Sequence, residues 1–121
     1  MRFAMITIGT RGDVQPYVAL GRGLQAAGHQ VCLISTDNYQ NFVRSHGLEF
    51  ASIGGDTQAI FSAQTWVQAG DRAVPILNLM REARSSMRPY AAAALRRAYE
   101  ACLAADAVCF TDSGGLLGYH I

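Results

Sequence analysis

The sequence predicts an α/β domain built on a doubly wound parallel sheet. Short apolar runs typical of buried strands alternate with helical segments, and glycines stand at the loops that join them. Strands that alternate with helices pair in parallel through right-handed crossovers. The predicted strands cover residues 3–8, 31–35, 48–53 and 107–110. The first three should lie in the order 3-2-1.

The first helix is predicted over Val14–Ala27, where Asp13 is a suitable N-cap. Its apolar positions, three or four residues apart, are Tyr17, Leu20, Leu24 and Ala27. A shorter helix is expected from about Asn38 to His46, with Asp37 as its cap. Glycines follow both helices, as is common at helix C-termini.

The alternation of strands and helices stops after Asp56 and resumes near Ala105. The elements predicted from there on are helices over 73–87 and 90–104, a strand over 107–110, a glycine-containing loop over 111–115 and a last helix over 116–121. A sheet that stops in a crossover leaves its last strand as an open edge. We therefore expect a fragment, truncated after about four strands, that can self-associate.

Composition excludes several classes of protein. Half of the 121 residues are hydrophobic and 16% are charged, so the chain can bury a core. The net charge of +1 gives no general reason to expect binding to nucleic acid. All ten cations are arginine, which excludes a P-loop lysine and Schiff-base chemistry.

The cysteine pattern and the hydropathy indicate a cytoplasmic protein. Cys32, Cys102 and Cys109 are odd in number and lie in apolar runs, which favours buried, reduced thiols. No apolar run approaches the ~20 residues of a membrane span, and the first strand starts too early for a signal peptide.

The segment GTRGD, residues 9–13, lies between the first strand and the first helix. It is open to three interpretations: a phosphate cradle, an adhesion tripeptide or a catalytic loop. The dinucleotide fingerprint needs three glycines before the helix, whereas Gly21 and Gly23 fall inside the helix. Asp37 has a suitable spacing for a ribose contact, but a helix cap is the simpler reading. The adhesion reading rests on a tripeptide that often occurs by chance.

A catalytic loop has the firmest physical basis. Ligands of open parallel sheets bind beyond the carboxyl ends of the strands, beside the switch point of the topology. The first and fourth strands should flank that point, and they are followed by loops that carry Asp13 and Asp112. Gly9 and Gly12 would let the backbone turn tightly, so that a substrate could approach Thr10 and Asp13. A carboxylate there could take a proton from a hydroxyl group.

Residues 7–36, TIGTRGDVQPYVALGRGLQAAGHQVCLIST, resemble the opening of the family 28 glycosyltransferase N-terminal domain. Residues 41–56 and 114–121 extend the resemblance. That group includes sterol-glucosyltransferase-like, macrolide, glycopeptide-antibiotic and rhamnosyl transferases. The resemblance implies a GT-B architecture, in which two Rossmann-like halves face a cleft.

The resemblance also implies which half of the protein binds each substrate. Residues 1–121 would be part of the N-terminal, acceptor-binding half, and the C-terminal half that binds the nucleotide-diphosphate sugar would be absent from this chain. The full protein would transfer a hexose with inversion to a lipophilic acceptor, whereas the chain alone would be inactive. No metal or cofactor would be needed. Asp13 would be the base, and Thr10 would lie near the acceptor or the sugar.

Further residues are predicted to contact substrates. Phe61, Trp66 and Met87 could line an apolar acceptor pocket, although core packing would also suit them. Arg81, Arg84 and Arg88 form a basic helix face that could contact a membrane surface. The full predicted substrate-binding set is Gly9, Arg11, Gly12, Phe61, Trp66, Met87, Asp112, Ser113, Gly114 and His120. Two alternatives stay open: a dinucleotide-binding module and a non-catalytic interaction domain.

Overall fold

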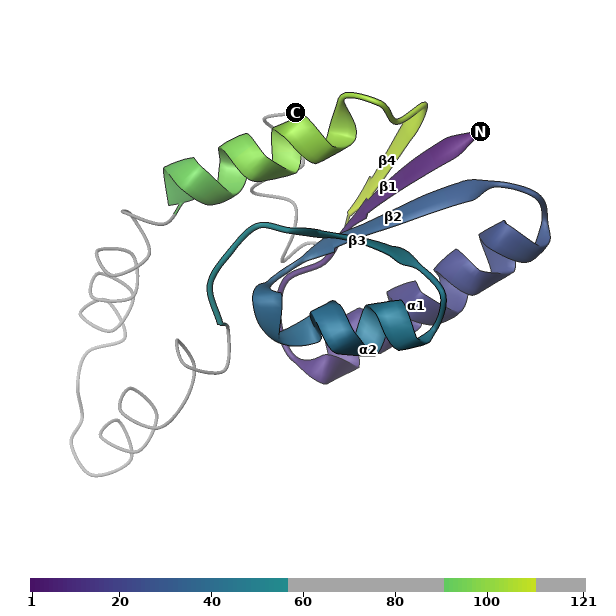
Figure 1. Ribbon diagram of the computed structural model, residues 1–121, viewed down its shortest axis with the longest axis horizontal. Coiled ribbons are helices and arrows are strands. Elements are labelled where there is room, and N and C mark those ends of the chain that lie inside the picture. The colour runs from purple at the N-terminus through teal and green to yellow at the C-terminus, as the bar shows by residue number, and fades with distance from the viewer. Residues whose placement is uncertain (57–90, 111–121) are drawn as a thin grey trace, which may run out of the picture.

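The computed structural model describes residues 1–56 and 91–110 (Figure 1). This part of the chain confirms the predicted α/β class. Four strands form one sheet in the order β3-β2-β1-β4, and every neighbouring pair is parallel. The strands are β1 (Arg2–Ile6), β2 (Gln30–Ser35), β3 (Glu49–Ser52) and β4 (Ala107–Phe110).

The position of β1 sets the place of the candidate site. Met5 pairs with Leu33 of β2 on one side and with Cys109 of β4 on the other. The chain therefore moves outward from β1 through β2 to β3, and then returns to the opposite side of β1. This confirms the predicted switch point between β1 and β4, where ligands of such sheets bind.

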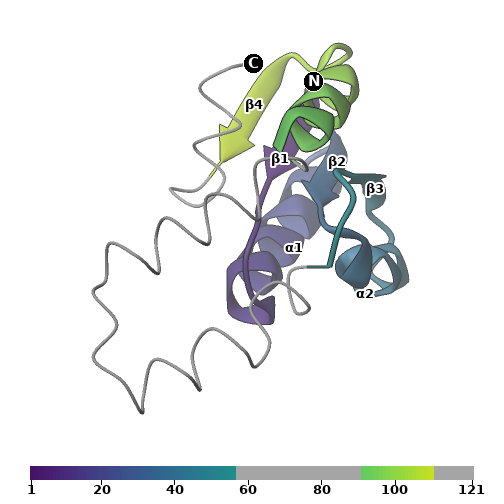
Figure 2. The same cartoon turned by 90° about the vertical axis from the view of Figure 1, so that its left-hand side faces the viewer.

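Helices cover both faces of the sheet (Figures 1 and 2). One face carries α1 (Arg11–Ala26), the 3-10 turn η1 (Asp37–Tyr39) and α2 (Gln40–Ser45). The helical residues 91–102 lie against the other face. Because both faces are covered, the middle parts of β1 and β2, residues 3–6 and 31–34, are continuous apolar runs rather than alternately polar.

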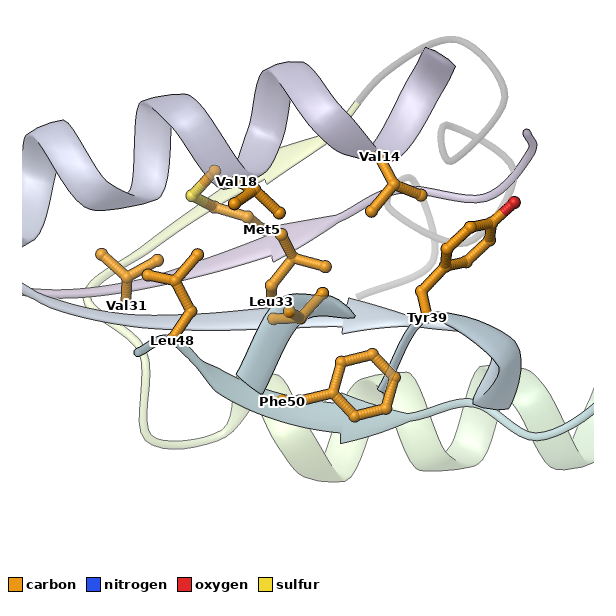
Figure 3. Close-up of a cluster of buried hydrophobic side chains, with 9 residues drawn as sticks. Met5, Val14, Val18, Val31, Leu33, Tyr39, Leu48 and Phe50 are labelled. Carbon is orange, nitrogen blue, oxygen red and sulfur yellow. The ribbon is translucent and has the colours of Figure 1, made fainter. Parts of the chain in front are cut away.

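Alternate side chains of each strand enter two separate apolar clusters. Met5 and Leu33 pack under α1 and α2, whereas Ile6 and Ile34 pack under the helix at 91–102. The first cluster, part of which is shown in Figure 3, comprises Met5, Val14, Val18, Val31, Leu33, Tyr39, Val43, Leu48 and Phe50. The second comprises Ala4, Ile6, Cys32, Ile34, Ile53, Ala98 and Cys102.

The first helix differs from the prediction in its start and in its buried face. It begins at Arg11, so Thr10 and not Asp13 is its N-cap. Its fully buried positions are Val14, Val18 and Gly21, and Leu20 is 51% exposed. The predicted apolar face is therefore wrong at Leu20 and at Ala27, which is also exposed. Gly21 takes the place of a side chain at the contact with the sheet.

The second helical segment is also capped one residue earlier than predicted. Thr36 is the N-cap of η1, and Asp37 is the first residue of that turn. The predicted helices over 73–87 and 116–121 lie outside the described residues, as does the start of the helix predicted over 90–104. The predicted strand over 107–110 is confirmed as β4.

Candidate active site at the carboxyl end of β1

The loop between β1 and α1 depends on Gly9. Its φ of +148° is rarely adopted by residues with a side chain. A Cβ atom at this position would lie only 2.8 Å from Cγ of Asp13. Gly9 therefore permits both the backbone conformation of the loop and the approach of the Asp13 carboxylate.

Asp13 folds back onto the N-cap of its own helix. Its Oδ2 accepts hydrogen bonds from the backbone N–H of Thr10 at 2.7 Å and from Thr10 Oγ1 at 2.9 Å. A carboxylate at this third helical position is favoured by the positive end of the helix dipole. Neither bond uses Oδ1, and the side chain lies at the surface. Within residues 1–56 and 91–110, the carboxylate is thus held through one of its two oxygens.

Two buried hydroxyl groups donate hydrogen bonds to backbone carbonyls of the same loop and of the first turn of α1. Thr7, which is 0% exposed, donates from Oγ1 to the backbone carbonyl of Asp13 at 3.2 Å. Tyr39, which is 5% exposed, donates from its hydroxyl to the carbonyl of Gly9 at 3.1 Å. Sequence analysis identified neither residue, since a threonine in a strand and a tyrosine in a short helix are ordinary core residues.

Gly12 has a different role from the one predicted. It has no positive φ and lies inside the first turn of α1, so the expectation that it makes a tight turn is wrong. A Cβ atom there would meet only Thr10 Oγ1, at 3.5 Å. Pro16, four residues on, has no N–H to donate to the Gly12 carbonyl. The Gly12 carbonyl therefore lacks the helical hydrogen bond that an N–H at position 16 would donate.

Arg11 turns toward the neighbouring helix α2. Its guanidinium lies 4.9 Å from the centre of the Phe42 ring, and that ring packs edge-on against His46. The stack is a cation–π contact of the kind worth about 0.5–1 kcal/mol at a surface. Arg11 borders the loop but rests on Phe42 in this structure.

Polar side chains also follow β2 and β3 at the same edge of the sheet. Asp37 accepts a hydrogen bond from Ser52 Oγ, which in turn accepts one from the N–H of Gly54. The carboxylate of Asp37 thus ties β3 to the turn after β2. Among the described residues, the Ser35 hydroxyl and the Asn38 amide nitrogen are buried without a hydrogen-bond partner.

All three cysteines are free thiols, as predicted. Burial, together with the nearby Glu49 carboxylate, raises the pKa of Cys32 from 9.0 to about 11. Burial also raises the pKa of Cys102. Both side chains lie in the second apolar cluster, away from the loop, and high pKa values make them poor nucleophiles.

The other predicted site residues lie outside the described residues. They are Phe61, Trp66, Met87, Asp112, Ser113, Gly114 and His120. Within the described ranges, 1–56 and 91–110, no group of three or more acidic, histidine or cysteine side chains could hold a metal ion. In the same ranges, no helix has the length and hydrophobicity to cross a membrane.

Comparison with known protein families identifies the family of this chain. Residues 3–109 match the glycosyltransferase family 28 N-terminal domain. The chain belongs to this family. The match covers all four strands of the family 28 domain except the first residue of β1 and the last residue of β4, and it includes the whole of the loop that carries Asp13.

Two yeast relatives support the assignment to family 28. The chain is 44% identical over 119 residues to a sterol 3-beta-glucosyltransferase of Eremothecium gossypii. It is 39% identical over 101 residues to a sterol 3-beta-glucosyltransferase of Saccharomyces cerevisiae. These alignments cover 98% and 84% of this chain, but the chain spans only 9% and 8% of the relatives' lengths.

Solved structures confirm the fold. The calicheamicin glycosyltransferase CalG4 superimposes with a TM-score of 0.69 over 98% of this chain and 26% of its own, at 17% identity. The glycosyltransferase SsfS6 of Streptomyces sp. SF2575 gives a TM-score of 0.60 over 99% of this chain and 36% of its own, at 23% identity. This family 28 domain therefore has the fold found in these glycosyltransferases.

Proposed function

We propose that this family 28 domain is the acceptor-binding part of an inverting glycosyltransferase, with Asp13 as the general base. The observation that carries the proposal is the placement of the Asp13 carboxylate. It stands at the carboxyl end of β1, beside the switch point, and its hydrogen bonds within the described residues are both made through Oδ2. Thr10 holds that oxygen and lines the same loop.

In the proposed reaction, an acceptor hydroxyl oxygen attacks the anomeric carbon of a nucleotide-diphosphate sugar. The bond from that carbon to the diphosphate breaks, and the nucleoside diphosphate leaves with the electron pair. The hydroxyl proton passes to Asp13. The yeast relatives are named as sterol 3-beta-glucosyltransferases, which favours a sterol hydroxyl as acceptor and glucose as the sugar. We expect no metal or resident cofactor, so a chelator should leave the rate unchanged.

The two alternatives have weaker support. A dinucleotide-binding module needs glycines that bring the pyrophosphate to a helix N-terminus, whereas Gly12 is already inside α1. Asp37, the candidate for a ribose contact, accepts a bond from Ser52. A non-catalytic domain would need the Asp13 carboxylate only as part of the capping box with Thr10, and the Asp13→Asn variant below distinguishes that role from catalysis.

Replacement of Asp13 by asparagine tests the proposal. Asparagine keeps an oxygen that can accept the bonds from Thr10, so the free energy of unfolding should change by less than about 1 kcal/mol. It cannot take a proton, so kcat of the intact protein should fall by about 10²–10⁴-fold, with little change in acceptor KM. The measurement is sugar transfer from radiolabelled nucleotide sugars to sterols.

Asp37→Asn is the matched control, because Asp37 is also an exposed carboxylate at this edge of the sheet. It should keep kcat within about threefold of the wild type, an order-of-magnitude bound for a charge outside the chemistry. Near-normal kcat in Asp13→Asn would show that Asp13 is structural only. An equal loss in both variants would show that the effect is not specific to Asp13.

A further inference from the structure

Tyr39 connects the apolar core to the candidate active-site loop. It follows β2 in sequence, 30 residues from Gly9, and its ring is buried in the first apolar cluster. In Figure 3 the ring lies near Val14, and the hydroxyl points away from the cluster. A buried tyrosine hydroxyl needs a hydrogen-bond partner, and here the partner is the Gly9 carbonyl at 3.1 Å.

The peptide group between Gly9 and Thr10 transmits this contact. Its carbonyl oxygen accepts from Tyr39, and its N–H donates to Asp13 Oδ2 at 2.7 Å. A peptide group is planar, and in the trans form its C=O and N–H point in opposite directions. A bond that fixes the carbonyl therefore also fixes the direction of the N–H that holds the carboxylate.

Gly9 makes the orientation of this peptide sensitive to its contacts. Glycine has an unusually wide choice of backbone conformations, so contacts from other elements restrict the Gly9–Thr10 peptide, and the bond from the Tyr39 hydroxyl is one of them. Thr7 holds the other side of the loop through the Asp13 carbonyl, but it does not touch the Gly9–Thr10 peptide. The Tyr39 hydroxyl bonds the carbonyl of that peptide, and the Asp13 carboxylate accepts from its N–H.

We propose that Tyr39 is a positioning residue that orients the Asp13 carboxylate through the Gly9–Thr10 peptide. The proposal rests on the function proposed above for Asp13. Its physical basis is that a misplacement of about 1 Å in a reacting group can cost about 10²-fold in rate. Tyr39 itself is buried, and its hydroxyl bonds the backbone of the loop.

Tyr39→Phe removes only the hydroxyl, and Tyr17→Phe is its matched control. Tyr17 packs against the same cluster from α1, and within the described part of the chain no hydrogen bond involves its hydroxyl. In the intact protein, Tyr39→Phe should lower kcat by about 10–100-fold and change KM by less than about threefold. Tyr17→Phe should leave both constants near the wild-type values. Equal kcat values for the two variants would overturn the proposal.

A double variant separates positioning from general weakening of the fold. If Tyr39 acts through Asp13, then adding Tyr39→Phe to Asp13→Asn should lower kcat by less than about threefold further. Multiplicative losses in the double variant would mean that Tyr39 affects the rate by another route, and would reject the proposal.

A readout without turnover distinguishes this inference from the proposed function. Tyr39→Phe should speed hydrogen exchange at the Thr10 amide by about tenfold, whereas Tyr17→Phe should not, since only the first releases the peptide. If the wild-type protein transfers no sugar, the proposed function fails, yet the exchange experiment still decides whether Tyr39 holds the carboxylate. Unchanged Thr10 exchange in Tyr39→Phe would overturn the inference.

Discussion

Gly9 stands at a position where the candidate site cannot accommodate a side chain. A Cβ atom at this position would be strained by the φ of +148° and would collide with the Asp13 carboxylate. Gly12, three residues on, has neither restriction, since its φ is ordinary and its surroundings are open. The conformation and the surroundings therefore require glycine at Gly9 but not at Gly12, in the first turn of α1.

Alanine at each position should separate these reasons. Gly9→Ala should lower the free energy of unfolding by about 1–3 kcal/mol and displace Asp13, with a loss of activity. Gly12→Ala should raise stability by up to about 1 kcal/mol, because alanine is the better helix former. Urea denaturation of both variants is the measurement. A Gly9→Ala protein as stable and active as the wild type would contradict the account of the loop.

At this scale the sequence predicted the site only in part. It identified Gly9, Thr10 and Asp13 as one loop, because a glycine-containing turn after a buried strand is a local pattern. The pair Thr10 and Asp13, three residues apart, is also a capping signature that could have placed the helix start. Tyr39 was out of reach, since its role depends on a contact across 30 residues.

Among the elements, α1 is held close to the sheet by Gly21. A Cβ atom at Gly21 would lie 3.1 Å from Leu48 Cδ1 and 3.3 Å from Val31 Cγ1, which is tighter than ordinary contact. Gly23, two residues on in the same helix, has no atom within 4 Å of such a Cβ. The pattern of apolar residues predicted the wrong buried face for α1, because a glycine that contacts the sheet adds nothing to that pattern.

This pair of glycines gives a prediction at the level of the helix. Gly23→Ala should stabilise the protein by about 0.5–1 kcal/mol through helix propensity alone. Gly21→Ala should lose that gain to overpacking and destabilise by about 1–3 kcal/mol. Thermal or urea unfolding of the two variants would show the difference in sign. If both variants are stabilised to the same extent, then the Leu48 side chain can move aside at little cost, and α1 is not closely packed against the sheet at Gly21.

At the scale of the whole molecule, the strands and their order were predicted best, because short apolar runs recur along the sequence. The strands were found to within two residues at either end, since buried parallel strands are continuous apolar runs. The order of the first three followed from the handedness of the crossovers, and the place of β4 beside β1 was expected from the switch point. The sequence pattern could not show which side chains of different elements meet at the edge of the sheet.

The two-sided core has a consequence for the pH dependence of stability. Cys32 lies in the second apolar cluster and is 3% exposed, and burial raises its pKa from 9.0 to about 11. The folded state therefore keeps the thiol proton at a pH where the unfolded chain releases it. The resulting contribution to stability is complete below about pH 9 and is lost as the pH rises toward 11.

We therefore expect the free energy of unfolding to fall between about pH 9 and pH 11 by up to about 2–3 kcal/mol on account of Cys32, since each pKa unit corresponds to about 1.4 kcal/mol. Cys32→Ala should lower stability at pH 7 because it leaves a small cavity, but it should show a shallower fall above pH 9. Comparison of the two slopes by urea denaturation removes the effect of every titrating group that the two proteins share. The pKa of Cys102 is also raised by burial, so the Cys32→Ala protein should still lose some stability above pH 9 because of Cys102. A Cys32→Ala Cys102→Ala protein should lack that contribution as well.

Identical slopes in the wild type and in Cys32→Ala would mean that the folded core tolerates the Cys32 thiolate. Water or a cation would then have to reach the layer between the sheet and the helix at 91–102.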